Sequence, residues 1–133
     1  MRSLAREAVF KYVFSRLFNQ GDEGLFDILL INDKLVKEDI EFAHALLSAV
    51  DKNKEKYLGL IGEMATGFKL SRIFNADKCA ILIGMAELDE FKETPVPVVI
   101  NEAVNIAAKY STEKSADFVN GILAAYAKGK DNG

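Results

Sequence analysis

Cysteine and histidine are almost missing from this sequence, which contains one of each, Cys79 and His44. A single cysteine cannot form an internal disulfide, and zinc sites need several clustered cysteine and histidine ligands. Glu41 and His44 have the Glu-x-x-His spacing of di-iron helix bundles, but such a site needs a second pair of the same kind. We therefore expect no metal and no other cofactor. We interpret His44 as a structural or surface residue and Cys79 as a small buried apolar side chain.

Long apolar runs and recognisable catalytic motifs are also lacking. With 28% charged residues, the sequence has no apolar stretch long enough to span a membrane, and its first residues lack the apolar core of a signal peptide. No GxxxxGKS/T, GxGxxG or GxSxG motif is present, and helical spacing scatters the carboxylates over different faces. We therefore expect a cytoplasmic protein that has no membrane partner and is not an enzyme.

Positive charge is in short supply, since the net charge is −3 and the isoelectric point is about 5.2. Nucleic-acid binding draws on clustered lysines and arginines, so this balance argues against binding through overall charge, although local basic patches remain compatible with it. What the chain has in quantity is apolar surface, because half of its 133 residues are hydrophobic. That composition suits one domain, or two small helical halves that share one core.

The apolar residues recur with the spacing of helices, and no strand-like alternation, heptad series or internal repeat competes with it. We therefore predict an all-α fold. The predicted segments are residues 3–18, about 25–34, a helix from about 37, 52–64, a short turn at 68–74, about 75–91, 97–110 and a helix from 115. Asn75 or Asp77 is predicted to cap the helix that ends near residue 91. The wide apolar coverage of residues 3–18 predicts that this helix is central.

The clearest local signals lie between Pro95 and Gly121. Pro97 suits the first position of a helix, where its missing N–H costs nothing. Residues 111–114 are predicted to form a polar turn, and Ser115 is predicted to be the N-cap of the next helix. Gly121 lies inside that helix, where glycine costs about 1 kcal/mol relative to alanine. We expect a close helix crossing at Gly121 to offset this cost.

Three arginines share one side of the first predicted helix. At 100° per residue, Arg2, Arg6 and Arg16 fall within an arc of roughly 80°. Two interpretations stay open for them. They form either a solvated basic edge or a short arginine platform that binds phosphate.

Four segments together resemble the NusB family of bacterial transcription antitermination factors. They are LAREAVFKYVF (4–14), LSRIFNADKCAILIGMAEL (70–88), PVPVVINEAVNIAAKYS (95–111) and KSADFVNGIL (114–123). The most specific part is INEAV followed by S-x-x-FVNG. The resemblance implies an all-helical fold of about seven helices in two three-helix-bundle-like halves, at roughly residues 1–66 and 67–130 of a single domain. It also implies pairing with NusE, a small-subunit ribosomal protein, and binding of boxA RNA within the transcription elongation complex, notably on ribosomal RNA operons.

Residue by residue, the resemblance assigns an RNA-binding role to positions at both ends of the chain. The family's arginine-rich start is present in a thinner form, as Arg2 and Arg6. Phe118 and Asn120 belong to the FVNG motif, where the family's aromatic residue resembles a base-stacking group, although the helical stripe alone would place Phe118 in the core. Lys114 is expected to add a positive charge. We expect Arg2→Ala and Arg6→Ala to weaken RNA binding while leaving thermal stability nearly unchanged.

Other positions concern the protein partner or depart from the family pattern. Glu87 matches an acidic position of the family's NusE-facing surface, and Phe14 stands where a tyrosine is frequent. Asp117 replaces a residue that is often basic and would repel phosphate. Leu82 and Ala86 stand where an arginine and a tyrosine are common, so contacts of those residues are not expected here.

We therefore expect RNA affinity to be mostly a property of a heterodimer with a basic ribosomal partner, which adds phosphate contacts. The alternative is a helical interaction module, such as a homodimer, with reduced RNA binding. The thinned arginine motif, Asp117 and Leu82 favour it. A third interpretation is the related RNA-docking domain that is fused to ribosomal RNA cytosine methyltransferases. Residues 1–133 contain no cofactor-binding segment, so we expect no such activity from them.

Overall fold

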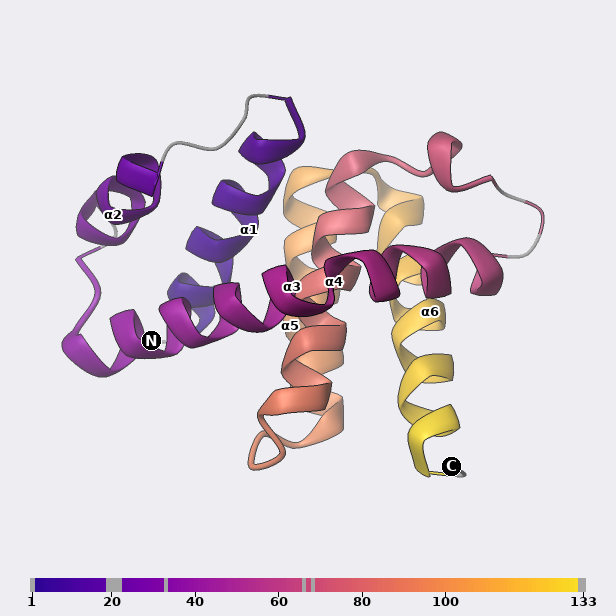
Figure 1. The fold of residues 1–133 in the computed structure, drawn as a ribbon. Helices are drawn as coiled ribbons and strands as arrows, with labels where there is room; N and C mark the ends of the chain where they lie inside the picture. Colours follow the sequence, from indigo (N-terminus) through magenta and orange to yellow (C-terminus); the bar gives the residue numbers. More distant parts are fainter. Residues whose placement is uncertain (1, 19–22, 33, 66, 68, 132–133) are drawn as a thin grey trace.

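The computed structural model describes residues 2–18, 23–32, 34–65, 67 and 69–131, and these ranges contain six α-helices and no strand. The helices are α1 (Arg2–Phe18), α2 (Glu23–Asn32), α3 (Lys37–Met64), α4 (Asn75–Glu90), α5 (Val96–Tyr110) and α6 (Glu113–Asp131), with a 3-10 turn, η1, at Leu70–Arg72 (Figure 1). The predicted all-α fold is confirmed, with six helices in place of about seven. The division near residue 66 stays a prediction.

The missing seventh helix results from the continuity of α3. The sequence predicts separate helices from about residue 37 and over 52–64, whereas α3 runs without a break through both. No proline or glycine interrupts residues 37–58. Asn53, which could have marked a boundary, donates its side-chain Nδ2 to the carbonyl of Ala49 at 3.2 Å, four residues back within the same helix. At 1.5 Å per residue, α3 is about 42 Å long and crosses the whole molecule.

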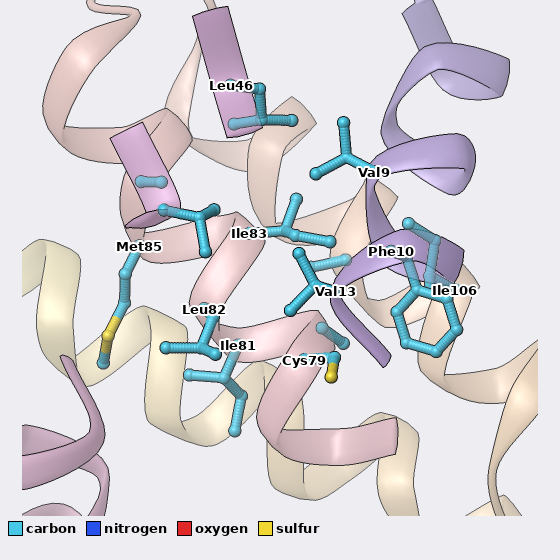
Figure 2. Close-up of a cluster of buried hydrophobic side chains, with 14 of the residues drawn as sticks. Val9, Phe10, Val13, Leu46, Cys79, Ile81, Leu82, Ile83, Met85 and Ile106 are labelled. Atoms are coloured by element: carbon cyan, nitrogen blue, oxygen red, sulfur yellow. The ribbon is translucent and has the colours of Figure 1, made fainter. Parts of the chain in front are cut away.

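The most enclosed helix is α4. The first helix has the central position that its apolar coverage predicts, since α1 packs against α2, α3, α4 and α5. Twelve residues of α4 are buried, and it packs against α1, α3, α5 and α6. Figure 2 shows its side chains, including Ile83, among those of Val9 and Val13 from α1, Leu46 from α3 and Ile106 from α5. A helix that is covered on all sides needs apolar residues on all sides, which explains the run CAILIGMAEL at 79–88.

A close helix crossing exists, but it lies at Gly84 rather than at Gly121. A Cβ atom at Gly84 of α4 would lie 2.6 Å from Cδ1 and 2.9 Å from Cδ2 of Leu123 on α6. A Cβ atom at Gly121 would meet nothing within 4 Å. The prediction that Gly121 serves helix packing is therefore wrong, because its exposed position faces away from the neighbouring helices.

Alanine at these two glycines is expected to have opposite effects on stability. Gly84→Ala should lower the free energy of unfolding by about 1–3 kcal/mol, because the methyl group overpacks against Leu123. Gly121→Ala should raise it by about 0.5–1 kcal/mol, because alanine favours the helix and nothing obstructs it. Urea unfolding of both variants measures the two values. Stabilisation by Gly84→Ala would contradict the close packing of α4 on α6.

Among the described helices, none is both long enough and apolar enough to cross a membrane. In the same residues, no group of three or more histidine, cysteine, aspartate or glutamate side chains is arranged to hold a metal ion. His44 is exposed, and its ring packs edge-on against Phe26 with 5.0 Å between the ring centroids. Cys79 is fully buried, and burial raises the pKa of its thiol to about 12, so the thiol stays protonated at neutral pH.

Candidate functional site

The residues predicted to bind RNA or a partner do not form one cluster. Arg6 bonds to Glu87 near the carboxyl end of α4, whereas Lys114 lies beside Ser115, which bonds to Asp77 at the amino end of α4 (Figure 1). The ten residues from Asp77 to Glu87 span about 15 Å along the helix axis. The predicted arginines and the predicted residues of α6 are therefore separated by most of the length of the central helix.

Arg6 and Glu87 form a buried ion pair with each other. Their exposed fractions are 4% and 1%. The guanidinium is bidentate, with Nε 2.7 Å from Oε1 and Nη2 2.6 Å from Oε2 of Glu87. Nη1 also lies 3.7 Å from Oε1 of Glu102, and the guanidinium lies over the ring of Phe42 at 5.3 Å. The structure therefore places neither Arg6 nor Glu87 on a surface, which corrects the positions expected for an RNA contact and a partner-facing carboxylate.

The other two arginines of α1 have separate surroundings. Arg2 keeps 46% of its side chain exposed, with its guanidinium 4.4 Å from the centroid of Phe42 and 3.8 Å from Glu93. Arg16, near the other end of α1, forms a bidentate pair with Asp51 on α3. The shared arc predicted for the three arginines therefore does not act as one platform, and only Arg2 presents an exposed guanidinium near the chain start.

A pocket of about 540 Å³ lies where η1, the start of α4 and the start of α6 meet. Its lining includes the predicted Lys114 and Phe118, which the structure brings together. It also includes Arg72, Phe74 and Asp77, which the sequence analysis did not select as site residues. Two aromatic rings and two cations in one hollow are suited to stacking a planar ring and neutralising an anion beside it.

The lining of this pocket includes a polar cluster centred on the buried Ser115. The backbone N–H of Ser115 donates to Oγ1 of Thr112, and the backbone N–H of Thr112 donates to Oγ of Ser115, both at 3.2 Å. This reciprocal pair makes Thr112 the cap of α6, with Ser115 as the third helical residue, so the predicted N-cap lies three residues too late. Oγ of Ser115 also donates to Oδ2 of Asp77 at 3.0 Å, which ties α6 to α4.

Asp77 has a different role from the predicted one. It is the third residue of α4, and neither it nor Asn75 makes a side-chain capping bond at the helix start, where Phe74 is the N-cap residue. Asp77 is only 4% exposed, and its Oδ1 is buried without a hydrogen-bond partner in the described part of the chain. A carboxylate oxygen in that state is an acceptor without a donor.

Asn120 lies outside this pocket. It is exposed on α6 and lines a second hollow, of about 380 Å³, between α5 and α6. The remainder of that hollow comes from α5, namely Val96, Pro97, Ile100, Asn101 and Val104. The FVNG motif is thus divided between two hollows, Phe118 in one and Asn120 in the other.

Phe14 lies on a third part of the surface. It is half-buried on α1, with its ring 5.9 Å from that of Phe10, which in turn lies 5.1 Å from the ring of Tyr110 on α5. Leu17, one turn along α1, is exposed, as are Ile28 and Ile31 on α2. Phe14 and Leu17, three residues apart on α1, share one side of that helix.

Two departures from the family pattern lie in the core. Leu82 and Ala86 of α4 are 1% and 0% exposed, so in this fold their positions provide packing and no surface contact. Asp117, in contrast, is exposed on α6, one residue before Phe118. It places a negative charge beside the predicted stacking residue.

Comparison with known proteins gives one consistent result. The family model described as the NusB family matches residues 1–128. The transcription antitermination protein NusB of Agathobacter rectalis is 35% identical over 129 residues, covering 95% of this chain and 98% of that protein. The protein of the same name from Methylacidiphilum infernorum is 35% identical over 130 residues, covering 96% and 90%.

Solved structures agree with the sequence comparison. A solved structure of T. maritima NusB has a TM-score of 0.88 at 32% identity, covering 96% of this chain and 91% of that one. A crystal structure of antitermination factors NusB and NusE in complex with double-stranded RNA has a TM-score of 0.85 at 25% identity, covering 96% of both chains.

Proposed function

The chain belongs to the NusB family, and from this premise we propose that it is an RNA-binding transcription antitermination factor that pairs with NusE. In this proposal it binds boxA-type nascent RNA as part of the transcription elongation complex and supports ribosomal RNA transcription. The likeness over nearly the whole chain to a NusB that was solved with NusE and RNA is the observation that carries the proposal. The protein acts in the cytoplasm and has no enzymatic activity of its own.

The RNA-facing surface that we propose is the pocket at the start of α6. Single-stranded RNA is held by stacking of splayed bases on aromatic rings and by cations beside the phosphates. Phe118 supplies a ring and Lys114 a cation at this pocket. Arg2 and Asn120 lie outside it and serve as contacts for flanking nucleotides in our proposal, whereas the buried Arg6 supports α1.

The surface for NusE is separate in our proposal and centres on Phe14. The half-buried ring of Phe14 and the exposed Leu17, three residues further along α1, offer an apolar surface to a protein partner. Glu87 contributes by holding Arg6 and not by contact, because both of its oxygens accept hydrogen bonds from that guanidinium.

Titration of a boxA-type RNA tests the proposal. We expect the chain with its cognate NusE to bind this RNA at least tenfold more tightly than the chain alone, because the few cations here leave most phosphate contacts to the basic partner. Fluorescence anisotropy at about 50 mM and about 200 mM salt measures both affinities and their salt dependence. An affinity that NusE leaves unchanged would contradict the heterodimer.

A matched pair of lysine variants locates the contact in the same titration. Lys114→Ala is expected to weaken RNA binding. It should also reduce the slope of the logarithm of the binding constant against the logarithm of the salt concentration by about one, because one phosphate contact is lost. Lys128→Ala, an exposed lysine near the far end of α6, is expected to change neither value. Equal effects of the two substitutions would remove the start of α6 from the site.

A helical interaction module with reduced RNA binding is the second candidate function. It is favoured by the burial of Arg6 and by the exposed Asp117 beside Phe118, which leave few cations for RNA. A homodimer would then use the apolar surface of α1 at Phe14 and Leu17. Failure to bind RNA even with NusE, together with self-association in sedimentation experiments, would support this candidate.

A further inference from the structure

Phe74 is an exposed aromatic residue that the fold does not require. It is the N-cap residue of α4, a position that favours serine, threonine, aspartate and asparagine because their side chains bond to the first free N–H groups. Phe74 makes no capping bond, and 59% of it is exposed. The ring therefore neither starts the helix nor fills the core, yet it lines the same pocket as Phe118.

The charges around this pocket fit an anionic chain. Arg72 and Lys114 line it, both are exposed, and neither forms an ion pair within the described part of the chain. The lining also holds two carboxylates, the exposed Glu113 and the buried Asp77, so the cations outnumber the carboxylates only among its exposed residues. A ligand that combines an aromatic ring with a phosphate matches this lining, and a nucleotide unit of RNA is such a ligand.

The unpartnered oxygen of Asp77 adds a hydrogen-bond acceptor to the lining. Oδ2 already accepts from Ser115, which fixes the orientation of the carboxylate. Oδ1 is buried and accepts nothing from the described residues, a state that is costly for a carboxylate. A donor on a molecule that occupies the pocket would satisfy it.

We propose that this pocket holds one unpaired base of the bound RNA, with Phe74 as a second stacking residue and Asp77 as the acceptor that selects bases with an amino group. The inference rests on the RNA binding proposed above and goes beyond it by assigning base selection to one side chain. Adenine and cytosine each present an amino N–H at the base edge, and carboxylates accept from such groups. The N3–H of uracil lies between two carbonyl oxygens, which a carboxylate repels.

Short homopolymers test the proposal without knowledge of the RNA register, because every register places the same base in the pocket. The probes are the hexamers rA6, rC6 and rU6, titrated into the full chain at low salt by NMR. Amide shifts at residues 72–77 and 112–118 locate the binding. We expect rA6 and rC6 to bind more tightly than rU6.

Two variants separate stacking from base selection. Phe74→Ala is expected to weaken all three hexamers by roughly tenfold, because stacking on an aromatic ring tolerates any base. Asp77→Asn, which keeps an acceptor for Ser115, is expected to weaken rA6 and rC6 by roughly tenfold and rU6 by less than twofold. Val98→Ala, an exposed apolar residue at the other end of α5, is the control and should change nothing.

Several outcomes would overturn the proposal. An equal effect of Asp77→Asn on all three hexamers would remove base selection from Asp77, and an unchanged affinity in Phe74→Ala would remove that ring from the site. If Asp77→Asn unfolds the protein, the affinities of the three hexamers for the unmodified chain test base selection instead. Equal affinities for rA6, rC6 and rU6 would contradict the proposal. Binding of boxA-type RNA by the heterodimer without hexamer shifts at the pocket would refute this inference alone. Loss of boxA binding itself would refute the proposed function.

Discussion

Replacing Arg6 with alanine is expected to lower the free energy of unfolding by about 3–5 kcal/mol, because it leaves a buried carboxylate without its partner. Glu87 is 1% exposed and receives two hydrogen bonds from Arg6, at 2.7 and 2.6 Å. Water cannot replace the guanidinium without opening the packing of α1 on α4. Urea unfolding followed by circular dichroism measures the loss.

Two further variants identify the cause of that loss. Arg2→Ala removes an exposed arginine from the same helix and is expected to change stability by no more than about 0.5 kcal/mol. The double variant Arg6→Met with Glu87→Leu removes both charges and should recover most of the stability lost in Arg6→Ala. A double variant as unstable as the single one would show that the ion pair is not the cause.

This expectation revises the use of Arg6 as a probe of RNA binding. The sequence alone predicts that Arg6→Ala weakens RNA binding without changing the thermal melt. With Arg6 buried against Glu87, a weaker RNA complex in that variant would follow from a displaced α1. Arg2 is the variant that tests the chain start, because its side chain is exposed.

The second large effect is expected at Asp89, where one carboxylate joins three helices. It accepts hydrogen bonds from Tyr57 of α3 at 2.6 Å, from Tyr126 of α6 at 2.8 Å, and from the ammonium of Lys130. Tyr57 is 0% exposed, so its hydroxyl has no access to water. Asp89→Ala should therefore lower the free energy of unfolding by about 2–3 kcal/mol, and thermal or urea unfolding measures it.

The same carboxylate predicts a dependence of stability on pH. Burial acts to raise the pKa of Asp89, but the hydrogen bonds from Lys130, Tyr57 and Tyr126 outweigh it and hold the pKa below its usual value. Because the folded pKa is the lower one, this stabilisation is present above the unfolded pKa of about 3.9 and is lost as the pH falls through the folded pKa. Between about pH 5 and about pH 2, the free energy of unfolding of Asp89→Asn should change less with pH than that of the unmodified chain. If the free energies of unfolding of the two proteins changed equally with pH, Asp89 would not be the source of the pH dependence.

Sequence patterns predicted those features that depend on neighbouring residues. The helices around residues 3–18 and 97–110 and the polar turn at 111–114 follow from local periodicity and from Pro97, and the structure has them within one or two residues. The sequence predicted separate helices from about residue 37 and over 52–64, whereas α3 continues through both, with Asn53 bonded to the carbonyl of Ala49 one turn back. The two glycines look alike in sequence, since both lie inside helices, and only the position of Leu123 distinguishes them.

The site depended on contacts that local patterns do not contain. Arg6 and Glu87 are 81 positions apart, so the sequence could assign each a role but could not pair them. The pocket combines η1, the start of α4 and the start of α6, and the family resemblance reached only its α6 side through Lys114 and Phe118. The available signal for the other side was Phe74, a large aromatic residue immediately before a predicted helix start, where a small polar residue is expected.

The position of α4 at the centre also affects the order of folding during synthesis. The apolar side of α1, with Val9 and Val13, is completed by α4, which begins at Asn75. At 5–20 residues per second, the ribosome needs roughly 3–11 s to add the residues between the end of α1 and the start of α4. The packing of α1 on α3 and α4 joins segments that are far apart in the sequence, and such contacts slow folding relative to a bundle in which only consecutive helices pack. During that interval, part of the first helix stays exposed to chaperones and to other nascent chains.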